Sequence, residues 1–264
     1  MLTSLQNPLV KQIRKLQKTK ERHRQKLFLL EGTHLIEEAL SMQWPLTAIC
    51  YTDAWKQRYE ELWQRLSESS SRLELVSEEV VATLTTTIHP DGVVAIAPRQ
   101  RSHSFPSSEP FHLGLALETV QDPGNLGTMI RTSAAAGIDR LWLSHNSVDL
   151  DHPKVLRASA GQWFRLPMTV SSNLANEIQT SKQSGVQVVA TLPQAPLTYW
   201  DIDLTRPTLV LAGNEGAGLS PDLVDLADVH VNIPLAPSVE SLNVAIAVSL
   251  ILYEANRQRR THLI

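Results

Sequence analysis

Hydrophobic and polar positions alternate along the chain in a way that predicts short strands separated by helices. In the first half, apolar runs of strand length cover residues 27–30, 46–51, 73–76 and 93–97. Apolar residues at helical spacing lie between these runs, over residues 33–40 and 54–66. Short apolar runs favour buried strands, whereas a period near 3.6 residues favours amphipathic helices. We therefore expect a small α/β domain over residues 27–98.

The second half repeats this alternation with more strongly apolar strands. Buried strands are predicted over residues 113–117, 141–144 and 208–212, and a further strand ends at 231–234. A helix is predicted over residues 125–136, because Gly137 follows its last apolar position and glycine is typical of a helix C-terminus. Ser241 is predicted to cap a final helix, and most apolar residues of that helix are expected to lie in the core. These elements indicate a second α/β unit.

The two halves are separated by a change in composition. Residues 98–110 are rich in Ser and Pro and lack apolar periodicity, which is typical of a loop. We expect a linker at residues 99–111 and a second domain over residues 112–264.

The first 26 residues are basic although the formal net charge of the chain is -3. Their Lys and Arg side chains face a single carboxylate, Glu21. Leu9, Ile13 and Leu16 share one stripe of a predicted helix, so the basic residues take its other faces. This arrangement suits an RNA phosphate backbone, and we interpret residues 1–26 as a basic helical arm that contacts RNA. A merely solvated surface is the alternative.

Composition also indicates the cellular compartment of the protein and limits the kinds of disulfide and metal site that it can hold. Cys50 is the only cysteine, which excludes an internal disulfide and a cysteine-based metal cluster. No apolar run approaches the roughly 20 residues that cross a bilayer, and the N-terminus lacks the apolar core of a signal peptide. We expect a cytoplasmic protein without a membrane partner. His145, Asp149, Asp151 and His152 could be drawn as a metal site, but their spacing matches no metal motif, so we expect no metal.

Three blocks in the second half carry the candidate chemistry. They are Gln121-Asp122-Pro123-Gly124-Asn125-Leu126-Gly127-Thr128-Met129-Ile130-Arg131, Ala212-Gly213-Asn214-Glu215-Gly216-Ala217-Gly218, and Ile233-Pro234-Leu235 leading to Ser241-Leu242-Asn243-Val244. In this order and spacing they resemble the SpoU/TrmH family of RNA 2'-O-ribose methyltransferases, which belong to the SPOUT superfamily and use S-adenosylmethionine. A phosphate-binding loop is the competing interpretation of the glycines, but no Gly-Lys-Ser/Thr ending follows them.

The resemblance implies roles for individual residues. The implied catalytic residues are Asn125, Arg131, Glu215, Ser241 and Asn243. The residues implied to hold the cofactor, through backbone contacts and apolar packing, are Leu211, Gly213, Gly218, Ile233 and Leu242.

Chemistry narrows the role of Arg131. Methylating a ribose 2'-hydroxyl requires removal of its proton, or stabilisation of the developing oxyanion, while the methyl group is held in line. A guanidinium stays protonated, with a pKa above about 12, so we place charge stabilisation and orientation before proton acceptance. Glu215 is a candidate for fixing loops or for pairing with Arg131. Structural roles remain alternatives: Asn125 as a helix N-cap, Arg131 as an exposed ion-pairing side chain, and Glu215 as a helix-capping carboxylate.

The resemblance further implies an architecture and a substrate. It implies a C-terminal SPOUT methyltransferase domain, Rossmann-like and trefoil-knotted, after an N-terminal L30e-like α/β domain that binds the RNA substrate, and a homodimer. It implies methyl transfer to a ribose 2'-hydroxyl in structured RNA, with ribosomal RNA as the first candidate and transfer RNA as the alternative. Lys154 and Arg157, in the helix near Pro153, are interpreted as RNA contacts or as solvated side chains.

One position departs from the family pattern. Pro237 stands where the family usually has the glycine of an Ile-Pro-Met-x-Gly sequence, and proline fixes φ and removes an amide donor. A non-catalytic RNA-binding or ribosome-assembly factor that retains the fold is therefore a further alternative.

Overall fold

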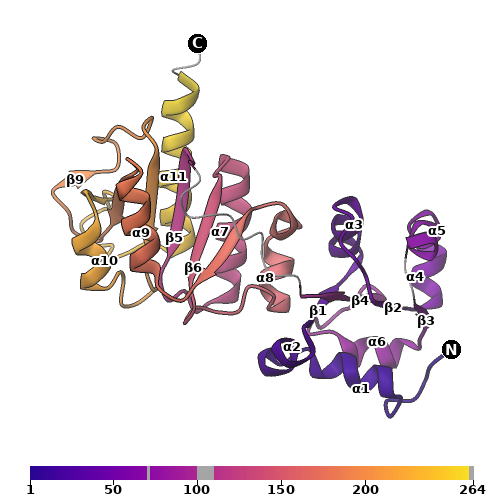
Figure 1. Cartoon of the computed structure of the whole chain (residues 1–264). Helices are drawn as coiled ribbons and strands as arrows, with labels where there is room; N and C mark the ends of the chain where they lie inside the picture. Colours follow the sequence, from indigo (N-terminus) through magenta and orange to yellow (C-terminus); the bar gives the residue numbers. More distant parts are fainter. Residues whose placement is uncertain (70–71, 100–109, 262–264) are drawn as a thin grey trace. The chain divides into compact units, whose positions relative to one another are not determined.

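The computed structural model describes residues 1–69, 72–99 and 110–261 and divides the chain into two compact units (Figure 1). The first unit comprises Met1–Gln100 and Asp149–Arg165, and the second comprises Arg101–Val148 and Leu166–Ile264. Most of the predicted linker, residues 100–109, lies outside the described residues. No helix among the described residues is both long enough and apolar enough to cross a membrane.

The first unit is built on a four-stranded sheet with the strand order β1-β4-β2-β3. These strands are β1 (Leu27–Glu31), β2 (Ala48–Tyr51), β3 (Leu73–Leu75) and β4 (Val93–Pro98). Strand β4 pairs antiparallel with β1 and β2, and β3 pairs parallel with β2. The predicted strands of the first half are all present, with shifts of one or two residues at their ends.

Helices cover both faces of this sheet. They are α1 (Pro8–Lys15), α2 (Thr19–Gln25), α3 (Thr33–Ser41), α4 (Asp53–Arg58), α5 (Glu60–Ser69) and α6 (Glu78–Leu84). Figure 1 shows α3, α4 and α5 on one face and α1 and α6 on the other. The predicted helix over 54–66 is broken at Tyr59, where φ is -124° and ψ is 49°, so it forms α4 and α5.

The basic N-terminal segment is part of this compact unit. The predicted stripe of Leu9, Ile13 and Leu16 is buried and packs against Val80 and Leu84 of α6. Asn7 caps α1, with its side-chain oxygen accepting the amide of Leu9 at 2.9 Å. Apolar burial therefore fixes α1 to the sheet and leaves its basic face toward solvent.

Residues 149–165, which the sequence places in the second domain, pack in the first unit. They form α8 (Pro153–Ala158) and the short 3-10 helix η1 (Gln162–Phe164). Leu156 and Phe164 are fully buried in the core that contains Phe28 of β1. The segment therefore completes the core of the N-terminal unit.

The second unit contains a seven-stranded sheet with the order β7-β6-β5-β10-β8-β11-β9. Its strands are β5 (Leu113–Leu117), β6 (Arg140–Ser144), β7 (Met168–Ser171), β8 (Gln187–Thr191), β9 (Leu197–Thr198), β10 (Thr208–Ala212) and β11 (Val229–Asn232). All of the pairings are parallel. Parallel sheets are covered on both faces, which explains why β5 and β10 are buried throughout and almost entirely apolar.

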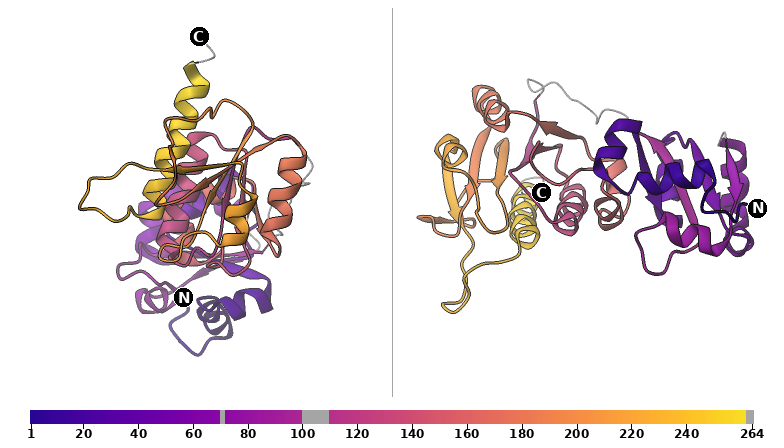
Figure 2. Two further views of the ribbon diagram at one scale, coloured as in Figure 1. Left: turned by 90° about the vertical axis from the view of Figure 1, so that its left-hand side faces the viewer. Right: turned by 90° about the horizontal axis from the view of Figure 1, so that it is seen from below.

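Helices lie on both faces of the parallel sheet (Figure 2). The helices α7 (Pro123–Ala136) and α11 (Val244–Thr261) lie side by side on one face. The helices α9 (Leu174–Gln183) and α10 (Pro221–Leu226) pack on the other, where Ile178 and Leu223 join the core around Leu209 and Leu211. The expected α/β fold is confirmed. Because all strands run the same way, the loops after β5, β8, β10 and β11 meet at one edge, where such folds bind ligands.

Candidate functional site

The loop after β5 leads directly into α7, which Asp122 caps. The Asp122 carboxylate accepts the amide of Asn125 at 2.8 Å, and Pro123 occupies the first helical position. The alternative role of Asn125 as the N-cap of this helix is wrong, because the helix begins at Pro123 and Asp122 caps it. The Asn125 side chain is consequently available for other contacts.

The glycine loop after β10 is folded around Asn214. Its side-chain oxygen accepts the amides of Gly216 and Ala217, both at 2.9 Å, and its side-chain nitrogen donates to the carbonyl of Thr119 at 2.9 Å. The main chains of Asn214 and Gly218 exchange two hydrogen bonds of 2.9 Å. A Cβ at Gly213 would lie 2.1 Å from the Gly218 oxygen, so the loop closes this tightly only with glycine at 213.

Glu215 joins the glycine loop to the loop after β5. Its carboxylate accepts the amides of Gln121 at 3.3 Å and Asp122 at 3.1 Å, and the side-chain amide of Asn125 at 3.1 Å. Burial alone would raise the pKa of Glu215, but the hydrogen bonds from its own backbone, Asn125, Asp122 and Gln121 outweigh burial and lower the pKa. The carboxylate therefore bonds the two loops and does not pair with Arg131.

The third loop, after β11, is joined through Asn243. Its side-chain nitrogen donates to the side-chain oxygen of Asn125 at 2.9 Å. Its side-chain oxygen accepts the amides of Ala245 at 2.9 Å and Ile246 at 3.4 Å, so Asn243 caps α11. The predicted cap, Ser241, lies too early for this role, because α11 begins at Val244. Glu215, Asn125 and Asn243 thus form one bonded series across the ends of β5, β10 and β11.

A cavity of about 330 Å³ lies beside this series. Its lining includes four of the residues expected to hold the cofactor, namely Gly213, Gly218, Ile233 and Leu242. Two of the expected catalytic residues, Glu215 and Ser241, also line it. Leu211 does not, because its side chain is fully buried in the core of the sheet.

Several lining residues escaped the sequence interpretation. Leu192 and Pro193 follow β8, and Glu240 and Val248 lie near the third block. No motif marks Leu192 and Pro193, since only the pairing of β8 with β10 and β11 brings them to this edge. The short Leu-Pro sequence after an apolar strand is the one local signal of a turn there.

Arg131 lies on the exposed side of α7. Its side chain makes no hydrogen bond or ion pair with any residue in the described ranges. Six residues separate it from Asn125, a distance of about 9 Å along a helix axis. The predicted alternative of a surface ion pair is therefore not observed, and the guanidinium is available to a ligand.

Pro237 sits in a turn outside the cavity lining. The amide of Val239 donates to the carbonyl of Ala236 at 2.9 Å, which places Pro237 at the second position of a β-turn. Proline is favoured there because its fixed φ matches the turn. The exposed ring replaces glycine without entering the cavity.

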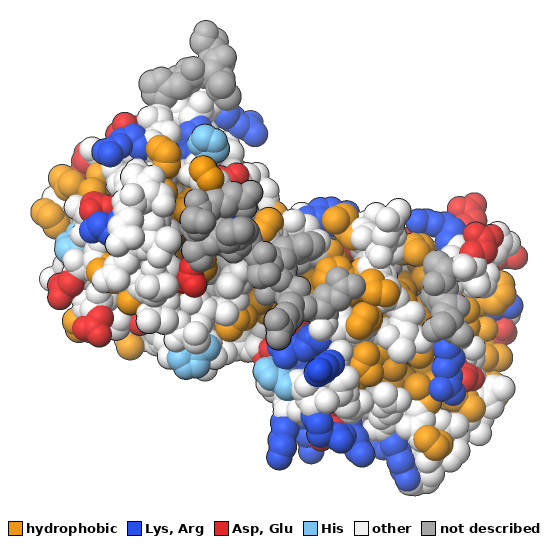
Figure 3. Space-filling model, in the orientation of Figure 1, with side chains coloured by type: hydrophobic (Ala, Val, Ile, Leu, Met, Phe, Trp, Pro, Cys, Tyr) orange, Lys and Arg blue, Asp and Glu red, His pale blue; other side chains and the backbone are white. Residues whose placement is uncertain are grey.

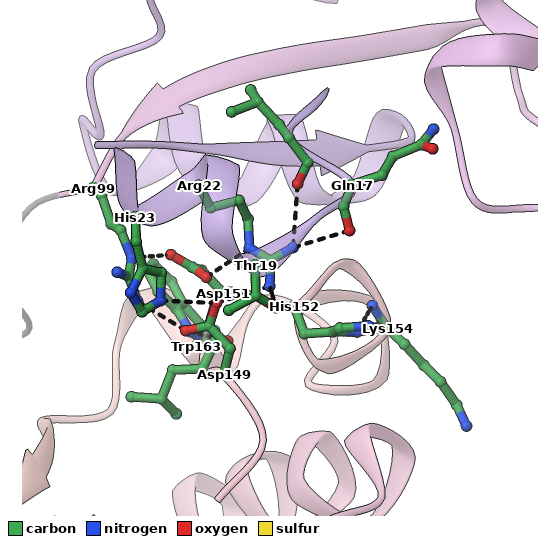
Figure 4. Close-up of polar contacts among 12 residues, drawn as sticks. Gln17, Thr19, Arg22, His23, Arg99, Asp149, Asp151, His152, Lys154 and Trp163 are labelled. Atoms are coloured by element: carbon green, nitrogen blue, oxygen red, sulfur yellow. Dashed lines mark hydrogen bonds and ion pairs between the residues drawn. The ribbon is translucent and has the colours of Figure 1, made fainter. Parts of the chain in front are cut away.

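The carboxylates of Asp149 and Asp151 are paired with arginines of the same unit (Figure 4). The buried Arg22 bonds Asp151 at 2.9 Å and Asp149 at 2.7 Å. Arg99 bonds the same two carboxylates. Burial raises the pKa of Asp151 to about 6, with the neighbouring Asp149 adding to the effect. These residues therefore fasten α2 and the end of β4 to the start of the 149–165 segment.

Two further basic residues differ from the prediction. Arg22, counted in the RNA-contacting segment, is fully buried. Arg157, considered as an RNA contact, forms an ion pair with Glu31, a buried residue at the end of β1. Both arginines stabilise the first unit.

Comparison with known proteins agrees with this geometry. Residues 112–253 match the SpoU rRNA Methylase family, and residues 7–95 match the MRM3-like substrate binding domain. The chain is 48% identical to an uncharacterized tRNA/rRNA methyltransferase of Synechocystis, over 98% of this chain and 94% of the relative. It is 33% identical to the 23S rRNA (guanosine(2553)-2'-O)-methyltransferase RlmP of Bacillus subtilis, over 96% of this chain and 97% of that protein.

A solved structure matches both units. The crystal structure of an AdoMet-bound rRNA methyltransferase from Sinorhizobium meliloti is 34% identical, with a TM-score of 0.85, and the match covers 100% of this chain and 98% of that chain. The family match covers the three loops that meet at the cavity, and the substrate-domain match covers most of the first unit. The chain belongs to the SpoU rRNA methylase family.

Proposed function

We propose that this protein transfers a methyl group from S-adenosylmethionine to a ribose 2'-hydroxyl in ribosomal RNA. The observation that carries the proposal is the bonded series Glu215, Asn125 and Asn243, which joins three loops beside the cavity. Family membership supplies the class of reaction, and RlmP is named for 2'-O-methylation of a guanosine in 23S rRNA.

The cavity offers what an adenosyl sulfonium compound requires. Gly213 lets the backbone approach a ligand closely, while Ile233 and Leu242 supply apolar surface. Glu215 and Glu240 add carboxylates to the lining, which favour a positively charged ligand. When bound, S-adenosylmethionine would supply an electrophilic methyl group: the carbon–oxygen bond would form as the carbon–sulfur bond breaks, the sulfur would keep the electron pair, and the hydroxyl proton would pass to solvent water.

Arg131 supplies the cationic group for the ribose oxygen. Its guanidinium stays charged and has no competing partner among the described residues. A preorganised donor of this kind stabilises a developing oxyanion and contributes a rate factor of about 10²–10³. Asn125 and Asn243 fix the start of α7, the helix that carries it. Ser241, exposed at the cavity, is assigned to orienting the substrate.

RNA is the macromolecular partner because the first unit presents unpaired cations. The exposed Lys and Arg side chains of α1, α2 and their connections gather on one surface (Figure 3). Those without a hydrogen bond or ion pair to the described residues are Lys11, Arg14, Lys15, Lys18, Lys20 and Lys26. Unpaired cations on a rigid helical surface are suited to phosphate contacts.

We propose a homodimer formed through α11. Ile246, Leu250 and Tyr253 on this helix are exposed at 49%, 37% and 52%, at spacings that place them on one stripe. A contiguous apolar stripe of this kind is typical of an interface, and a second copy offers the same stripe for self-complementary packing. Ile246→Glu should convert a dimer to a monomer in sedimentation velocity. An unchanged sedimentation coefficient at every concentration would exclude this surface.

Two alternatives remain under test. Transfer RNA is the second substrate candidate, because the Synechocystis relative is named a tRNA/rRNA methyltransferase. A non-catalytic RNA-binding factor is the alternative that Pro237 suggests. This proline lies in a turn outside the cavity lining, which weakens that alternative. Because relatives such as RlmP of Bacillus subtilis are named for methylating bacterial ribosomal RNA, we also propose a cytoplasmic location.

In the test, the protein is incubated with labelled S-adenosylmethionine and either ribosomal RNA or transfer RNA, in separate reactions. Label on ribosomal RNA alone supports the proposal, and label on transfer RNA alone replaces the substrate. Calorimetric titration with S-adenosylmethionine separates the remaining alternative, since a non-catalytic factor should bind RNA without binding this compound.

A further inference from the structure

A second cavity, of about 300 Å³, lies wholly within the first unit. It opens where β1 ends and α3 begins, and the loop after α6 forms its opposite wall. None of its lining residues belongs to the three blocks around the proposed cofactor site. Its volume lies at the lower end of the range for small-ligand sites.

The base of this cavity is rigid. The Glu31 carboxylate, only 4% exposed, forms an ion pair with Arg157 and accepts the amide of Thr86 at 3.0 Å. The Asp91 carboxylate accepts both the amide and the hydroxyl of Thr33, at 2.8 and 2.7 Å. These bonds fix β1, α3, α8 and the loop after α6 against one another, so the cavity is preformed.

Polar groups in the lining lack partners. Thr85 is 8% exposed, and its hydroxyl oxygen is buried without a hydrogen bond to any described residue. A buried unsatisfied hydroxyl is unfavourable unless a ligand or water satisfies it. The amides of His34 and Leu35, in the first turn of α3, also have no partner among the described residues. The residues of the cavity wall therefore include a buried unsatisfied hydroxyl and two unpaired amides.

The chemistry of the lining selects a neutral, planar ligand. His34 and His89 are exposed at the cavity and offer flat rings, and Leu35 and Val93 add apolar surface. The Arg157 guanidinium in the lining is paired with Glu31, so the Asp91 carboxylate leaves the cavity with a net negative charge that disfavours a phosphate. The same carboxylate accepts amino and imino N–H groups, which nucleobases carry. Unpaired RNA bases are recognised in this way, by stacking on such rings and by hydrogen bonds to their edges.

We propose that this cavity receives an unstacked base of the RNA, next to phosphate contacts made by α1 and α2 of the same unit. The inference rests on the proposed RNA substrate but not on methyl transfer. The first unit then contacts both the phosphate backbone and a base of the RNA, and different residues make the two kinds of contact.

The test compares two fluorescent ligands with the full chain: a single-stranded 12-nucleotide RNA of mixed sequence, and an abasic ribose-phosphate oligomer of the same length. The phosphates are identical, so only base contacts distinguish them. The native chain should bind the RNA more tightly. The double variant His34→Ala/His89→Ala should lose about 5- to 100-fold in affinity for the RNA, the range for loss of one stacked base, with no change for the abasic oligomer.

Two further variants make the result specific. Thr85→Val keeps the side-chain shape and should weaken RNA binding about 2- to 10-fold, as expected for one lost hydrogen bond. Lys11→Ala should weaken both oligomers and reduce the salt slope by about 0.7, the value for one phosphate contact with a single strand. The histidine variant should leave that slope unchanged.

Three outcomes overturn the proposal. They are equal affinity of the native chain for the two oligomers, equal weakening of both by the histidine variant, or no effect of that variant on either. Methyl transfer is not the readout, so a failure of the base site is distinguishable from a failure of the catalytic proposal.

Discussion

The side chain of Asn243 donates a hydrogen bond of 2.9 Å to the side-chain oxygen of Asn125, 118 residues away in the sequence. The same Asn125 donates through its nitrogen to Glu215, so each end of its amide contacts a different loop. Asn243 meanwhile caps α11 through its oxygen. One amide pair therefore connects the start of α7, which carries Arg131, with the start of α11, which lines the cavity.

Asn243→Asp separates the two tasks of this side chain. A carboxylate still accepts the amide of Ala245 and caps α11, but it has no N–H to donate to Asn125. We expect methyl transfer to fall by about 10- to 100-fold, the factor for one lost positioning bond of about 1.4–2.7 kcal/mol, while the helix cap is retained.

Asn243→Ala is the matched comparison, because it removes both bonds. The unfolding free energy should then fall by a further 0.5–2 kcal/mol or so, the usual cost of a lost N-cap. Urea unfolding and single-turnover methyl transfer measure the two effects. Full activity of Asn243→Asp would show that the bond to Asn125 does not organise the site.

Gly213→Ala should abolish tight binding of S-adenosylmethionine. The added Cβ would approach the Gly218 backbone to 2.1 Å, so the glycine loop has to open. Gly216→Ala is the control, because its Cβ would meet nothing nearer than the Asn214 side chain at 3.6 Å. Calorimetry should give a loss of at least about tenfold for the first variant, or 1.4 kcal/mol, and little change for the second. Equal affinities would place the cofactor elsewhere.

Arg22→Met should destabilise the first unit. Removing this buried arginine leaves Asp149 and Asp151 with one fewer cationic partner, and breaking a buried ion pair costs about 3–5 kcal/mol. Arg24→Met is the control, because Arg24 is exposed and, among the described residues, pairs with Glu21 alone. Exposed pairs contribute roughly 0–1 kcal/mol. Similar urea midpoints for the two variants would contradict the structural role of Arg22.

Acid should weaken the loop connection made by Glu215. The folded-state pKa of this carboxyl is below its ordinary value of 4.5, so its stabilising contribution is complete above that pH and is lost as the pH falls through the lowered value. The difference in S-adenosylmethionine affinity between the native chain and Glu215→Gln should be constant from pH 8 to about 5 and shrink below pH 4.5. A difference that vanishes by pH 6 would be incompatible with a lowered pKa.

Local patterns predict most elements but not their partners. The strands β5 and β10 lie where the apolar runs place them, because strands buried on both faces need continuous apolar sequence. Periodicity cannot tell which sheet a helix covers. The sequence therefore places α8 in the second unit, whereas Leu156 of this helix packs in the core of the first. Two helix caps also differ from the residues that the pattern suggests. Asp122 caps α7 in place of Asn125, and Asn243 caps α11 in place of Ser241.

The candidate site was predictable to a similar degree. Gly213, Ile233 and Leu242 carry signals in their blocks, and all three line the cavity. Leu211, in the strand just before the second block, was also expected to hold the cofactor, but its side chain is buried in the core. Leu192 and Pro193 carry no chemical signal, and only the parallel order of β10, β8 and β11 brings them to the site. Burial of Arg22 likewise depends on carboxylates more than 100 residues away, which charge patterning cannot reveal.

The most direct test of the proposed reaction is nucleotide-level mapping of 2'-O-methylation on ribosomal RNA incubated with S-adenosylmethionine and either the native chain or Arg131→Ala. The native chain should methylate one ribose, and the variant should do so about 10²- to 10³-fold more slowly while binding S-adenosylmethionine equally well. Absence of a new 2'-O-methyl group with the native chain, or an undiminished rate with Arg131→Ala, would contradict the account.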